Sequence, residues 1–507
     1  MLPARDKPAN DPASAPARRD LAVIDIGSNS VRLVQFRLEG RAVWPVFNEK
    51  TMAGLGRGLR TSGSLHPEGV EAALRALRRF SSLLDAKGVI DRRAVATAAV
   101  RDAKDGAQFV RRAAKQARME IQVIDGPEEG RLSTLGVLAG IGDGHGVAGD
   151  LGGSSVELTR LNGREVGPSV SLPLGPLSVF EGPPGDAREQ KPLIEAGLDE
   201  AADLLKGSGP EFYAVGGAWR SFARLAMALY GHPLGLLHQY TLERDRVLRA
   251  ADFASSLTEA SIADTPGVSS KRAATLPYAA QLLKRIVKRG GFKRVVFSAY
   301  GLREGVVFSQ DLNLLAKGDP LIEGAAALAR PVSPEPGFGP ALAAWIEPVF
   351  KPEPGWFSSG DDIRLRAAAA RLADLGSRMH PDHRAELAAQ QVLYAPFGGI
   401  THPQRAFLSL VVHHRYEGRK PALNSELCER LLSDEQAEAA MRLGLALRLG
   451  AALSGRSAGV LSAFRLKRSD ERLMLHVQQG REELVVERAR QRFEQLAAAL
   501  GLKAQTA

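Results

Sequence analysis

Two short segments of the chain share an aspartate followed by a turn of small polar residues. The first reads Asp25-Ile-Gly-Ser-Asn-Ser-Val-Arg-Leu and the second Asp150-Leu-Gly-Gly-Ser-Ser-Val-Glu-Leu, and they align without a gap. Successive backbone N–H groups in such turns form a concave site for an anion, because small side chains let a ligand approach closely. Carboxylate and phosphate oxygens are also the ligands that a divalent cation takes. The two segments therefore predict a site that holds a phosphate together with a divalent cation.

The same pattern has a purely structural interpretation, since ordinary hairpin turns are also built from Ser, Asn and Gly. For the first segment alone, the two interpretations are evenly balanced. The second segment favours the ligand site, because a repeat at about the length of a small domain indicates a duplicated domain. The two turns would then face each other across a cleft. We expect these turn residues to hold phosphate oxygens: Gly27, Ser28, Asn29, Ser30, Gly152, Gly153, Ser154 and Ser155.

Two glutamates, Glu128 and Glu129, follow Gly126-Pro127. Proline favours the first position of a helix, so both glutamates are predicted in a first turn, where the helix dipole favours negative charge. An ordinary helix-terminal acid explains both of them, and for Glu128 we prefer that interpretation. The functional alternative is that one of the two reaches the cleft as a general base.

A predicted strand at Phe212–Val215 runs into Gly216 and Gly217 immediately before a helix. A helix N-terminus that is reached through glycine allows the close approach of a phosphate or a nucleotide. Gly216 and Gly217 are therefore candidate nucleotide- or phosphate-binding residues. The Gly-rich stretch at 54–65 lacks the Gly-Lys-Ser/Thr ending of a P-loop and is not one.

Composition limits the class of protein and its partners. The chain has 507 residues, a net charge of +10 and a pI near 9.7. The charge favours an anionic partner such as a nucleic acid, polyphosphate or a membrane surface, but an Arg-rich composition without any such partner also explains it. The single cysteine, Cys428, excludes a disulfide framework and a cysteine-rich metal site, and it is typical of the cytoplasm. Because no secretory signal or membrane-length apolar run is present, we expect a cytoplasmic protein with no membrane partner.

Strands and helices alternate up to about residue 310, which predicts two α/β layers. Ala- and Leu-rich helices then follow, separated by Pro/Gly-rich stretches, and the end of the chain is predicted as a small α+β region. The expected strands are Ala42–Glu49, Ala94–Ala99, Ile121–Ile124, Phe212–Val215, Arg294–Ser298, Ala463–Val477 and Glu482–Val486. The expected helices are 68–86, 103–118, 127–138, 188–206, 271–289 and 488–500.

Six motifs stand in order over roughly residues 20–308: DIGSNSVRL, TAAVR, IDGPEEGRL, DLGGSSVEL, VGGAWR and SAYGLREG. As an ordered set they resemble the exopolyphosphatase / guanosine pentaphosphate phosphohydrolase (Ppx/GppA) family. The resemblance implies an α/β fold of the actin/Hsp70/sugar-kinase superfamily, in which two actin-like (RNase H-like) domains surround a cleft. Five regions are expected in this chain: a disordered segment at 1–19, domain I at 20–135, domain II at 136–310, a helical HD-like domain at 311–456 and an α+β region at 457–507.

The resemblance also implies an activity and residue roles. The expected reaction is Mg²⁺-dependent hydrolysis that removes the terminal phosphate of inorganic polyphosphate processively, or the 5′ terminal phosphate of guanosine pentaphosphate. Glu129 matches the family glutamate that activates water, and Asp150 and Glu157 match acids near metal and water. Asp25, the acid of the first turn, is a further metal ligand, and Arg101 matches the family's phosphate-facing arginine. A homodimer is expected on general grounds, and a specific nucleic acid partner is not.

Longer members of the family carry a helical domain related to HD phosphohydrolases. Here the segment ARLADLGSRMH at 370–380 has Ala373 where the histidine of a His-Asp pair would precede Asp374, so we expect a degenerate, inactive domain. The remaining histidines of this region do not rebuild a metal site: His380, His383, His402, His413 and His414. Five arginines either line a channel for a long polyanion or, as we prefer for any one of them, form a solvated face: Arg364, Arg366, Arg371, Arg405 and Arg415.

Two other functions share the two aspartate turns. One is an ATP-dependent kinase of the same superfamily, and the other is a non-catalytic sensor of polyphosphate or of an alarmone. The segments EEGR and SAYGLREG favour the hydrolase over the kinase, and Glu129 favours an enzyme over a sensor.

Overall fold

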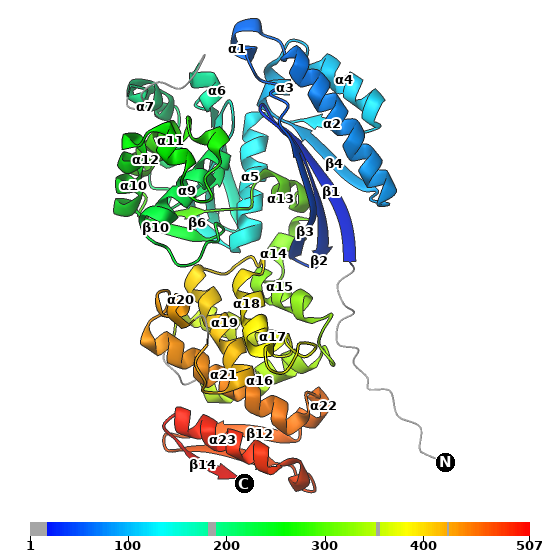
Figure 1. The fold of residues 1–507 in the computed structure, drawn as a ribbon, viewed down its shortest axis with the longest axis vertical. Helices are drawn as coiled ribbons and strands as arrows, with labels where there is room; N and C mark the ends of the chain where they lie inside the picture. Colours follow the sequence, from blue (N-terminus) through cyan, green and yellow to red (C-terminus); the bar gives the residue numbers. More distant parts are fainter. Residues whose placement is uncertain (1–17, 181–188, 351–354, 423–424, 507) are drawn as a thin grey trace. The chain divides into compact units, whose positions relative to one another are not determined.

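The computed structural model describes residues 18–180, 189–350, 355–422 and 425–506, which fall into two compact units. The N-terminal unit spans residues 18–320, and the C-terminal unit begins at Leu321 (Figure 1). The disordered segment was predicted at 1–19, and its residues 1–17 lie outside the described residues. Arg18 and Arg19 belong to the first strand, so the predicted end at residue 19 is wrong. No helix in the described part of the chain has the length and apolar character needed to cross a membrane.

The first sheet of the N-terminal unit has the strand order β3-β2-β1-β4-β5. β1 pairs antiparallel with β2 and parallel with β4, so the first aspartate turn joins the two strands of a hairpin. The strands are β1 (Arg18–Ile26), β2 (Val31–Glu39), β3 (Ala42–Thr51), β4 (Asp91–Ala96) and β5 (Ile121–Val123).

The second sheet repeats this arrangement in the order β10-β11-β9-β6-β7-β8. β6 pairs antiparallel with β7 and parallel with β9, as β1 does with β2 and β4. The strands are β6 (Gly144–Leu151), β7 (Val156–Gly163), β8 (Glu165–Leu172), β9 (Glu211–Gly216), β10 (Tyr240–Glu243) and β11 (Arg294–Phe297). The duplication inferred from the two aspartate turns is therefore confirmed at the level of strand order.

Helices cover both sheets. The first lobe carries α1 (Leu59–Ser62), α2 (Pro67–Ala86), α3 (Ala98–Asp102) and α4 (Gly106–Ala117). The remaining helices of this unit are α5 (Gly126–Ile141), α6 (Pro176–Val179), α7 (Lys191–Asp199), α8 (Ala202–Leu205), α9 (Gly217–Leu229), α10 (Arg244–Ser256), α11 (Glu259–Ala263), the 3₁₀ helix η1 (Ser270–Arg272), α12 (Leu276–Gly290), α13 (Leu302–Phe308) and α14 (Leu312–Ala316).

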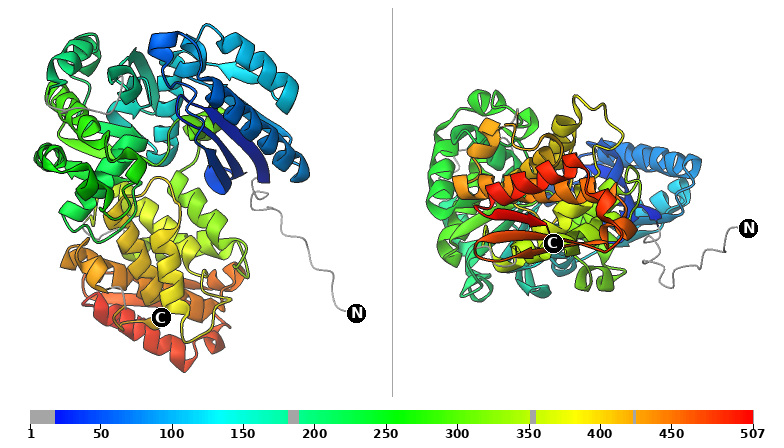
Figure 2. Two further views of the ribbon diagram at one scale, coloured as in Figure 1. Left: turned by 45° about the horizontal axis from the view of Figure 1, so that its top comes forward. Right: turned by 90° about the horizontal axis from the view of Figure 1, so that it is seen from below.

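Two helices, α5 and α13, lie between the two sheets, as Figure 1 shows. Their residues Leu132, Leu135 and Phe308 pack with Val23 and Phe36 of the first sheet in one buried cluster. α5 also contacts β6, β7 and β8 of the second sheet. α2 and α4 cover the other face of the first sheet (Figure 2). Because α13 follows the second sheet in the chain yet packs on the first, the two predicted domains form one compact unit.

The C-terminal unit is a helical bundle that ends in a three-stranded sheet with the order β12-β13-β14. Its helices are α15 (Pro320–Ala329), α16 (Phe338–Phe350), α17 (Ser359–Leu372), α18 (Arg384–Tyr394), α19 (His402–Glu417), α20 (Ser425–Glu429), α21 (Asp434–Ser454), α22 (Ala458–Leu461), the 3₁₀ helix η2 (Glu482–Leu484) and α23 (Glu487–Ala499). Its strands are β12 (Phe464–Arg468), β13 (Arg472–Val477) and β14 (Lys503–Thr506). α23 packs against α21 and β14 (Figure 2).

Several predicted elements have different bounds. The strand expected at Ala94–Ala99 ends at Ala96, and α3 begins two residues later. The helix expected at 188–206 is divided into α7 and α8, and the one expected at 271–289 begins only at Leu276. The strand expected at Glu482–Val486 is wrong, because this segment forms η2. The three exposed residues Arg481 to Glu483 cannot alternate between a buried and a solvent face, which is what a strand here would need.

The preference for a solvated arginine face is wrong for three of the five arginines of the helical domain. Arg366, Arg405 and Arg415 are all buried. Arg405 donates to the backbone oxygens of Val392, Leu393 and Ala395 at the end of α18, so it satisfies helix carbonyls that would otherwise lack donors. These residues stabilise the bundle from inside.

Candidate active site

The two aspartate turns have the same backbone geometry. Gly27 N donates to Ser30 O at 3.0 Å, and Gly152 N donates to Ser155 O at 2.9 Å. The turns also meet, since Ser28 Oγ and Ser154 Oγ lie 3.0 Å apart. The prediction that the two turns face each other is therefore confirmed.

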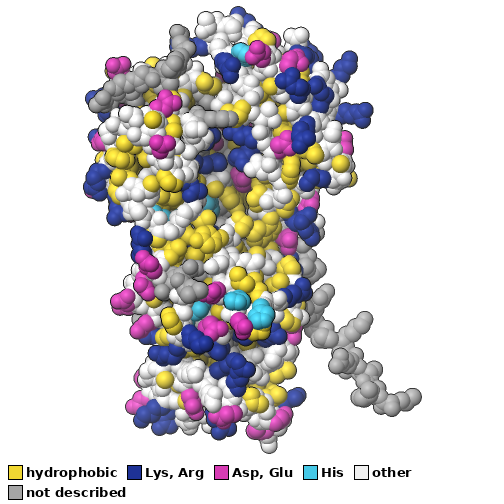
Figure 3. All heavy atoms as spheres, viewed as in Figure 1, with side chains coloured by type: hydrophobic (Ala, Val, Ile, Leu, Met, Phe, Trp, Pro, Cys, Tyr) yellow, Lys and Arg dark blue, Asp and Glu magenta, His cyan; other side chains and the backbone are white. Residues whose placement is uncertain are grey.

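A cavity of about 280 Å³ opens between the two turns. Figure 3 shows Lys and Arg side chains, in dark blue, along the hollow between the two halves of the N-terminal unit. The predicted site residues that line the cavity are Asp25, Gly27, Ser28, Asn29, Ser30, Glu129, Asp150, Gly152, Gly153, Ser154, Ser155, Gly216 and Gly217. Two predicted residues, Arg101 and Glu157, do not line it, although both contact residues that do.

The two aspartates occupy matching positions near the ends of β1 and β6. Asp25 pairs in register with Arg32 of β2, and Asp150 pairs with Glu157 of β7. Ser133 of α5 donates a hydrogen bond to Asp150 Oδ2. Burial raises the pKa of both aspartates, and the charge of Asp25 raises the pKa of Asp150 further. The sheets thus bring two negative charges from separate domains to one place.

Glu128 and Glu129 have different surroundings in the first turn of α5. Asp125 caps this helix by accepting from Glu128 N at 2.8 Å. Glu128 binds Arg131 through both carboxylate oxygens at 2.6 and 2.8 Å, as expected of a structural helix acid. Glu129 is only 8% exposed and lines the cavity. Its Oε2 lies 3.7 Å from Nη1 of Arg101, which also donates to the carbonyl of Ile124.

Glu157 lies behind Glu129 and is 1% exposed. Its Oε1 accepts from Ser171 Oγ at 2.8 Å, whereas its Oε2 has no hydrogen-bond partner among the described residues. Burial raises the pKa of Glu157 to about 7, and the nearby charge of Asp150 adds to the effect. Burial also raises the pKa of Glu129 well above its usual value, with further contributions from Glu157, Asp150 and Asp25. The four carboxylates therefore repel one another in a space with little water.

The described residues fit a divalent cation that is shared with a substrate. Among the described residues, no group of three Asp, Glu, His or Cys side chains is placed to hold a metal by itself, so the ligand set Asp25, Asp150 and Glu157 stays a prediction. Glu157 is held away from the cavity by Ser171. Asp25 and Asp150 remain, and Mg²⁺ commonly takes one or two carboxylates and completes its shell with phosphate oxygens and water. A cation here would also relieve the repulsion among the carboxylates.

Five basic residues that our sequence reasoning did not single out also line the cavity: Arg32, Lys50, Arg220, Arg272 and Arg303. Burial lowers the pKa of Arg32 and Arg220 to about 10 and that of Lys50 to about 8, and neighbouring guanidinium groups lower all three further. Crowded cations of this kind are stabilised by an anion placed between them. Arg220 and Arg303 belong to motifs quoted above, and Arg32 lies opposite Asp25, whereas nothing in the sequence pointed to Lys50 or Arg272.

Gly216 and Gly217 allow the chain to pass close to the cavity. Gly216 has φ 104°, which glycine adopts readily, and a Cβ there would lie 2.4 Å from Leu151 O. At Gly217 a Cβ would lie 2.1 Å from Nη2 of Arg272, whose Nη1 donates to Gly217 O at 3.1 Å. The second glycine therefore leaves room for an arginine at the cavity wall.

Comparisons with known proteins give matches over both units. The family model described as "Ppx/GppA phosphatase family" matches residues 36–314, and the one described as "Exopolyphosphatase, C-terminal" matches residues 336–506. Exopolyphosphatase 1 of Mycobacterium tuberculosis is 28% identical over 318 residues, which cover 60% of this chain and 92% of the relative. Exopolyphosphatase 1 of Mycobacterium leprae is 26% identical over 315 residues, with the same coverage of 60% and 92%.

Solved structures give the same fold for the N-terminal part. A Ppx/GppA family member from Aquifex aeolicus has 25% identity and a TM-score of 0.53, and the match covers 59% of this chain and 99% of the other. An exopolyphosphatase from Cytophaga hutchinsonii has 24% identity and a TM-score of 0.53, with 58% and 97% covered. These similarities support the two actin-like lobes of the N-terminal unit.

Proposed function

We propose, because the chain belongs to the Ppx/GppA phosphatase family, that it is an exopolyphosphatase, which hydrolyses the terminal phosphoanhydride bond of inorganic polyphosphate processively and releases orthophosphate. The family is one of phosphohydrolase enzymes that generally need a divalent metal, and we propose Mg²⁺ for this chain. The observation that carries the proposal is that one cavity combines the acidic residues Glu129, Asp25 and Asp150 with basic residues that include Lys50 and Arg272.

The two turns would hold the terminal phosphate. Their backbone N–H groups and the hydroxyls of Ser28 and Ser154 come from opposite sides of the cavity. Phosphoanhydride hydrolysis needs charge neutralisation and alignment more than covalent help from the protein. Fixed N–H dipoles supply this without rearranging during the reaction. The turns would thereby orient the phosphorus atom for attack along the line of the leaving oxygen.

Glu129 would orient and deprotonate the attacking water. Its Oε2 accepts no hydrogen bond from the described residues and its pKa is raised, which suits a general base that works near neutral pH. Arg101, at 3.7 Å, would hold the carboxylate in place, and its contact with phosphate stays a prediction from the family resemblance because it does not line the cavity. Glu157 would position Glu129 through repulsion rather than touch the substrate, since it does not line the cavity. Bound Mg²⁺ supplies charge neutralisation at the phosphate oxygens, and Asp25 and Asp150 are the residues proposed to hold it.

The basic residues of the cavity favour a long polyanion. Arg32, Arg220 and Arg303 line the same cavity as the two turns, and the following phosphates of a chain would neutralise them. Guanosine pentaphosphate is the second candidate substrate, because Gly216 and Gly217 precede α9 and leave backbone N–H groups beside the cavity. Homodimer formation and a cytoplasmic location stay predictions.

The test is a comparison of kcat/KM for long-chain polyphosphate and guanosine pentaphosphate, with and without Mg²⁺. We expect metal-dependent release of orthophosphate from polyphosphate without ATP or any acceptor, and a higher kcat/KM for polyphosphate. Strict dependence on ATP and an acceptor would instead indicate a kinase. Binding of polyphosphate without turnover in Mg²⁺ would indicate a sensor.

A further inference from the structure

The C-terminal unit contains a second cavity of about 130 Å³, enclosed by α15, α16 and α17. Its wall includes the guanidinium-bearing residues Arg330 and Arg371, the ring of Phe338, the hydroxyl-bearing Ser333 and the carboxyl-bearing Asp374. The cavity therefore combines two cations and one anion with an apolar wall.

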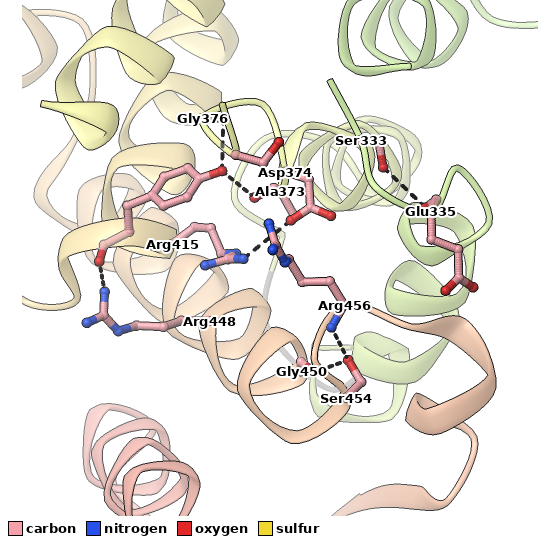
Figure 4. Close-up of polar contacts among 12 residues, drawn as sticks. Ser333, Glu335, Ala373, Asp374, Gly376, Arg415, Arg448, Gly450, Ser454 and Arg456 are labelled. Atoms are coloured by element: carbon pink, nitrogen blue, oxygen red, sulfur yellow. Dashed lines mark hydrogen bonds and ion pairs between the residues drawn. The ribbon is translucent and has the colours of Figure 1, made fainter. Parts of the chain in front are cut away.

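Asp374 is the unusual residue of this cavity. It is 2% exposed, and its Oδ1 lies 3.5 Å from Nη2 of Arg415. Its Oδ2 is buried and accepts no hydrogen bond from any residue that the structure describes. Figure 4 shows one carboxylate oxygen directed at Arg415 and the other on the side of Ser333, which belongs to the cavity wall. Buried carboxylate oxygens are nearly always paired, so this oxygen is suited to a donor brought by a ligand.

The charges around Asp374 decide what kind of ligand brings that donor. Arg330 and Arg371 lie on the wall. Burial raises the pKa of Asp374, and the charges of Arg415 and Arg456 partly oppose this effect. Figure 4 shows the Arg456 side chain reaching toward the carboxylate. Two guanidinium groups beside the carboxylate, together with two more residues of this kind on the cavity wall, disfavour a metal ion or an ammonium group. The ligand must therefore be an anion that nevertheless carries a proton donor.

We propose that this cavity binds inorganic orthophosphate in a protonated form. The charged oxygens would accept hydrogen bonds from Arg371 and Arg330, and the P–OH group would donate to Oδ2 of Asp374. Sulfate has the same shape and charge class but carries no proton near neutral pH, so it would direct a lone pair at the carboxylate. Asp374 would thus select phosphate over sulfate. The proposal concerns binding in the C-terminal unit and does not depend on the reaction in the other cavity.

The test uses hydrogen–deuterium exchange of the full chain, because it separates this cavity from the active-site cavity. We expect orthophosphate, at concentrations up to roughly 10 mM, to slow exchange in peptides covering 322–340 and 367–378, a range that reveals millimolar affinity. Sulfate should act at least about tenfold more weakly, the factor expected for the loss of a charge-assisted hydrogen bond. Equal protection by both ions, or no protection by phosphate, would overturn the proposal. Protection by glycine, which carries an ammonium group, in place of phosphate would also overturn it.

Variants assign the effect to named residues. Arg371→Gln should remove the protection, whereas the matched control Arg378→Gln, an exposed arginine outside the cavity wall, should retain it. Asp374→Asn should bring the affinities for sulfate and phosphate together, because the amide can donate to either anion. If Asp374→Asn does not fold, the phosphate-to-sulfate comparison in the natural chain and the Arg371→Gln variant still decide the matter. Unchanged protection in Arg371→Gln would contradict the proposal.

Discussion

Neighbouring glutamates in α5 illustrate how environment separates structural from chemical residues. Glu128 is paired with Arg131 one helical turn away, while Glu129 is buried near three other acids and one arginine. Both occupy the first turn, where the helix dipole stabilises a negative charge. Only Glu129 retains an oxygen without a hydrogen-bond donor among the described residues. The adjacent pair therefore provides a matched comparison.

Glu129→Gln should lower turnover by roughly 100- to 10,000-fold, the range typical for removal of a general base. Polyphosphate binding should persist, because the two turns and the basic wall remain intact. The measurement is kcat for orthophosphate release together with an equilibrium binding assay. Glu128→Gln is the control and should change kcat by less than about twofold, as expected for a lost surface ion pair. Loss of binding in a folded Glu129→Gln variant would assign this residue another role.

Glu157 should reduce stability at alkaline pH in the metal-free protein. Its pKa is raised from 4.5 in the unfolded chain to about 7 in the fold, so the stability of the natural chain falls as pH rises through this interval. Glu157→Gln mimics the neutral acid and should be on the order of 2–3 kcal/mol more stable than the natural chain at pH 8, where both states of the latter are ionised. Denaturant unfolding at pH 5 and pH 8 checks this. A gain of equal size at both pH values would contradict the electrostatic cause.

Residues that bind through backbone turns were easier to predict than residues that act through long side chains. The two aspartate turns can be recognised in the sequence from their composition and from their repetition, and both line the cavity. Lys50 and Arg272 lie in segments without any motif and reach the cavity only because β3 and η1 pass beside it. Arg405 shows the reverse case, in which an arginine of a basic-looking helix is needed to satisfy buried carbonyls. Side-chain direction depends on tertiary packing, which a sequence pattern does not contain.

At the scale of elements, α5 decides where Glu129 lies. Glycines allow this helix to approach its neighbours closely. A Cβ at Gly130 would lie 2.3 Å from Ser169 Oγ, and one at Gly136 would lie 2.0 Å from Gly301 O. The first contact sets the distance from α5 to the second sheet, and the other sets its distance to the segment before α13. Close packing of α5 thus connects the general base to both sheets.

Gly136→Ala should cost about 1–3 kcal/mol of stability, as overpacking in a core usually does. It should also lower kcat by about tenfold or more, because a small shift of α5 displaces Glu129 from the water it orients. The control is Gly360→Ala in the first turn of α17, where a Cβ meets nothing within 4 Å. That variant should be neutral or more stable by up to about 1 kcal/mol. Denaturant unfolding and kcat are measured for both variants. Unchanged kcat in Gly136→Ala would contradict the positioning role of α5.

Element boundaries were predictable where chemistry marks them. Pro127 marks the start of α5 as expected, and Pro67 begins α2 within one residue of the predicted helix at 68–86. The end of β4 was missed because Thr97 to Val100 continue its run of small and β-branched residues, although Ala98 already begins α3. The helix α3 buries Ala98, Ala99 and Val100 in a row, and a buried strand would show the same run of consecutive apolar residues. Short apolar runs therefore leave the choice to tertiary packing.

At the scale of the whole molecule, the boundaries of the duplicated lobes differ from the boundary between the two compact units. The two sheets repeat the same strand order, yet α5 and α13 pack between them, so the predicted limits at 135 and 310 do not separate compact bodies. The division that contacts support lies at Pro320. The sequence pattern revealed the repeat through its turns, whereas only the structure shows how α13 packs between the two sheets.

A fragment of residues 18–320 should therefore fold cooperatively and hydrolyse polyphosphate with Mg²⁺. It contains every residue that lines the active-site cavity, from Asp25 to Arg303, and the buried clusters of both lobes. The mycobacterial relatives support this expectation, because 92% of their length matches only 60% of this chain. Calorimetry should give a single unfolding transition, and kcat on short polyphosphate should stay within about tenfold of the full chain, since no residue proposed for the chemistry is removed.

A fragment ending at residue 300 lacks α13 and is the control, and it should not fold because Leu302, Val306 and Phe308 no longer fill the cluster between the sheets. Loss of turnover in a well-folded 18–320 fragment would instead show that the chemistry needs the C-terminal unit.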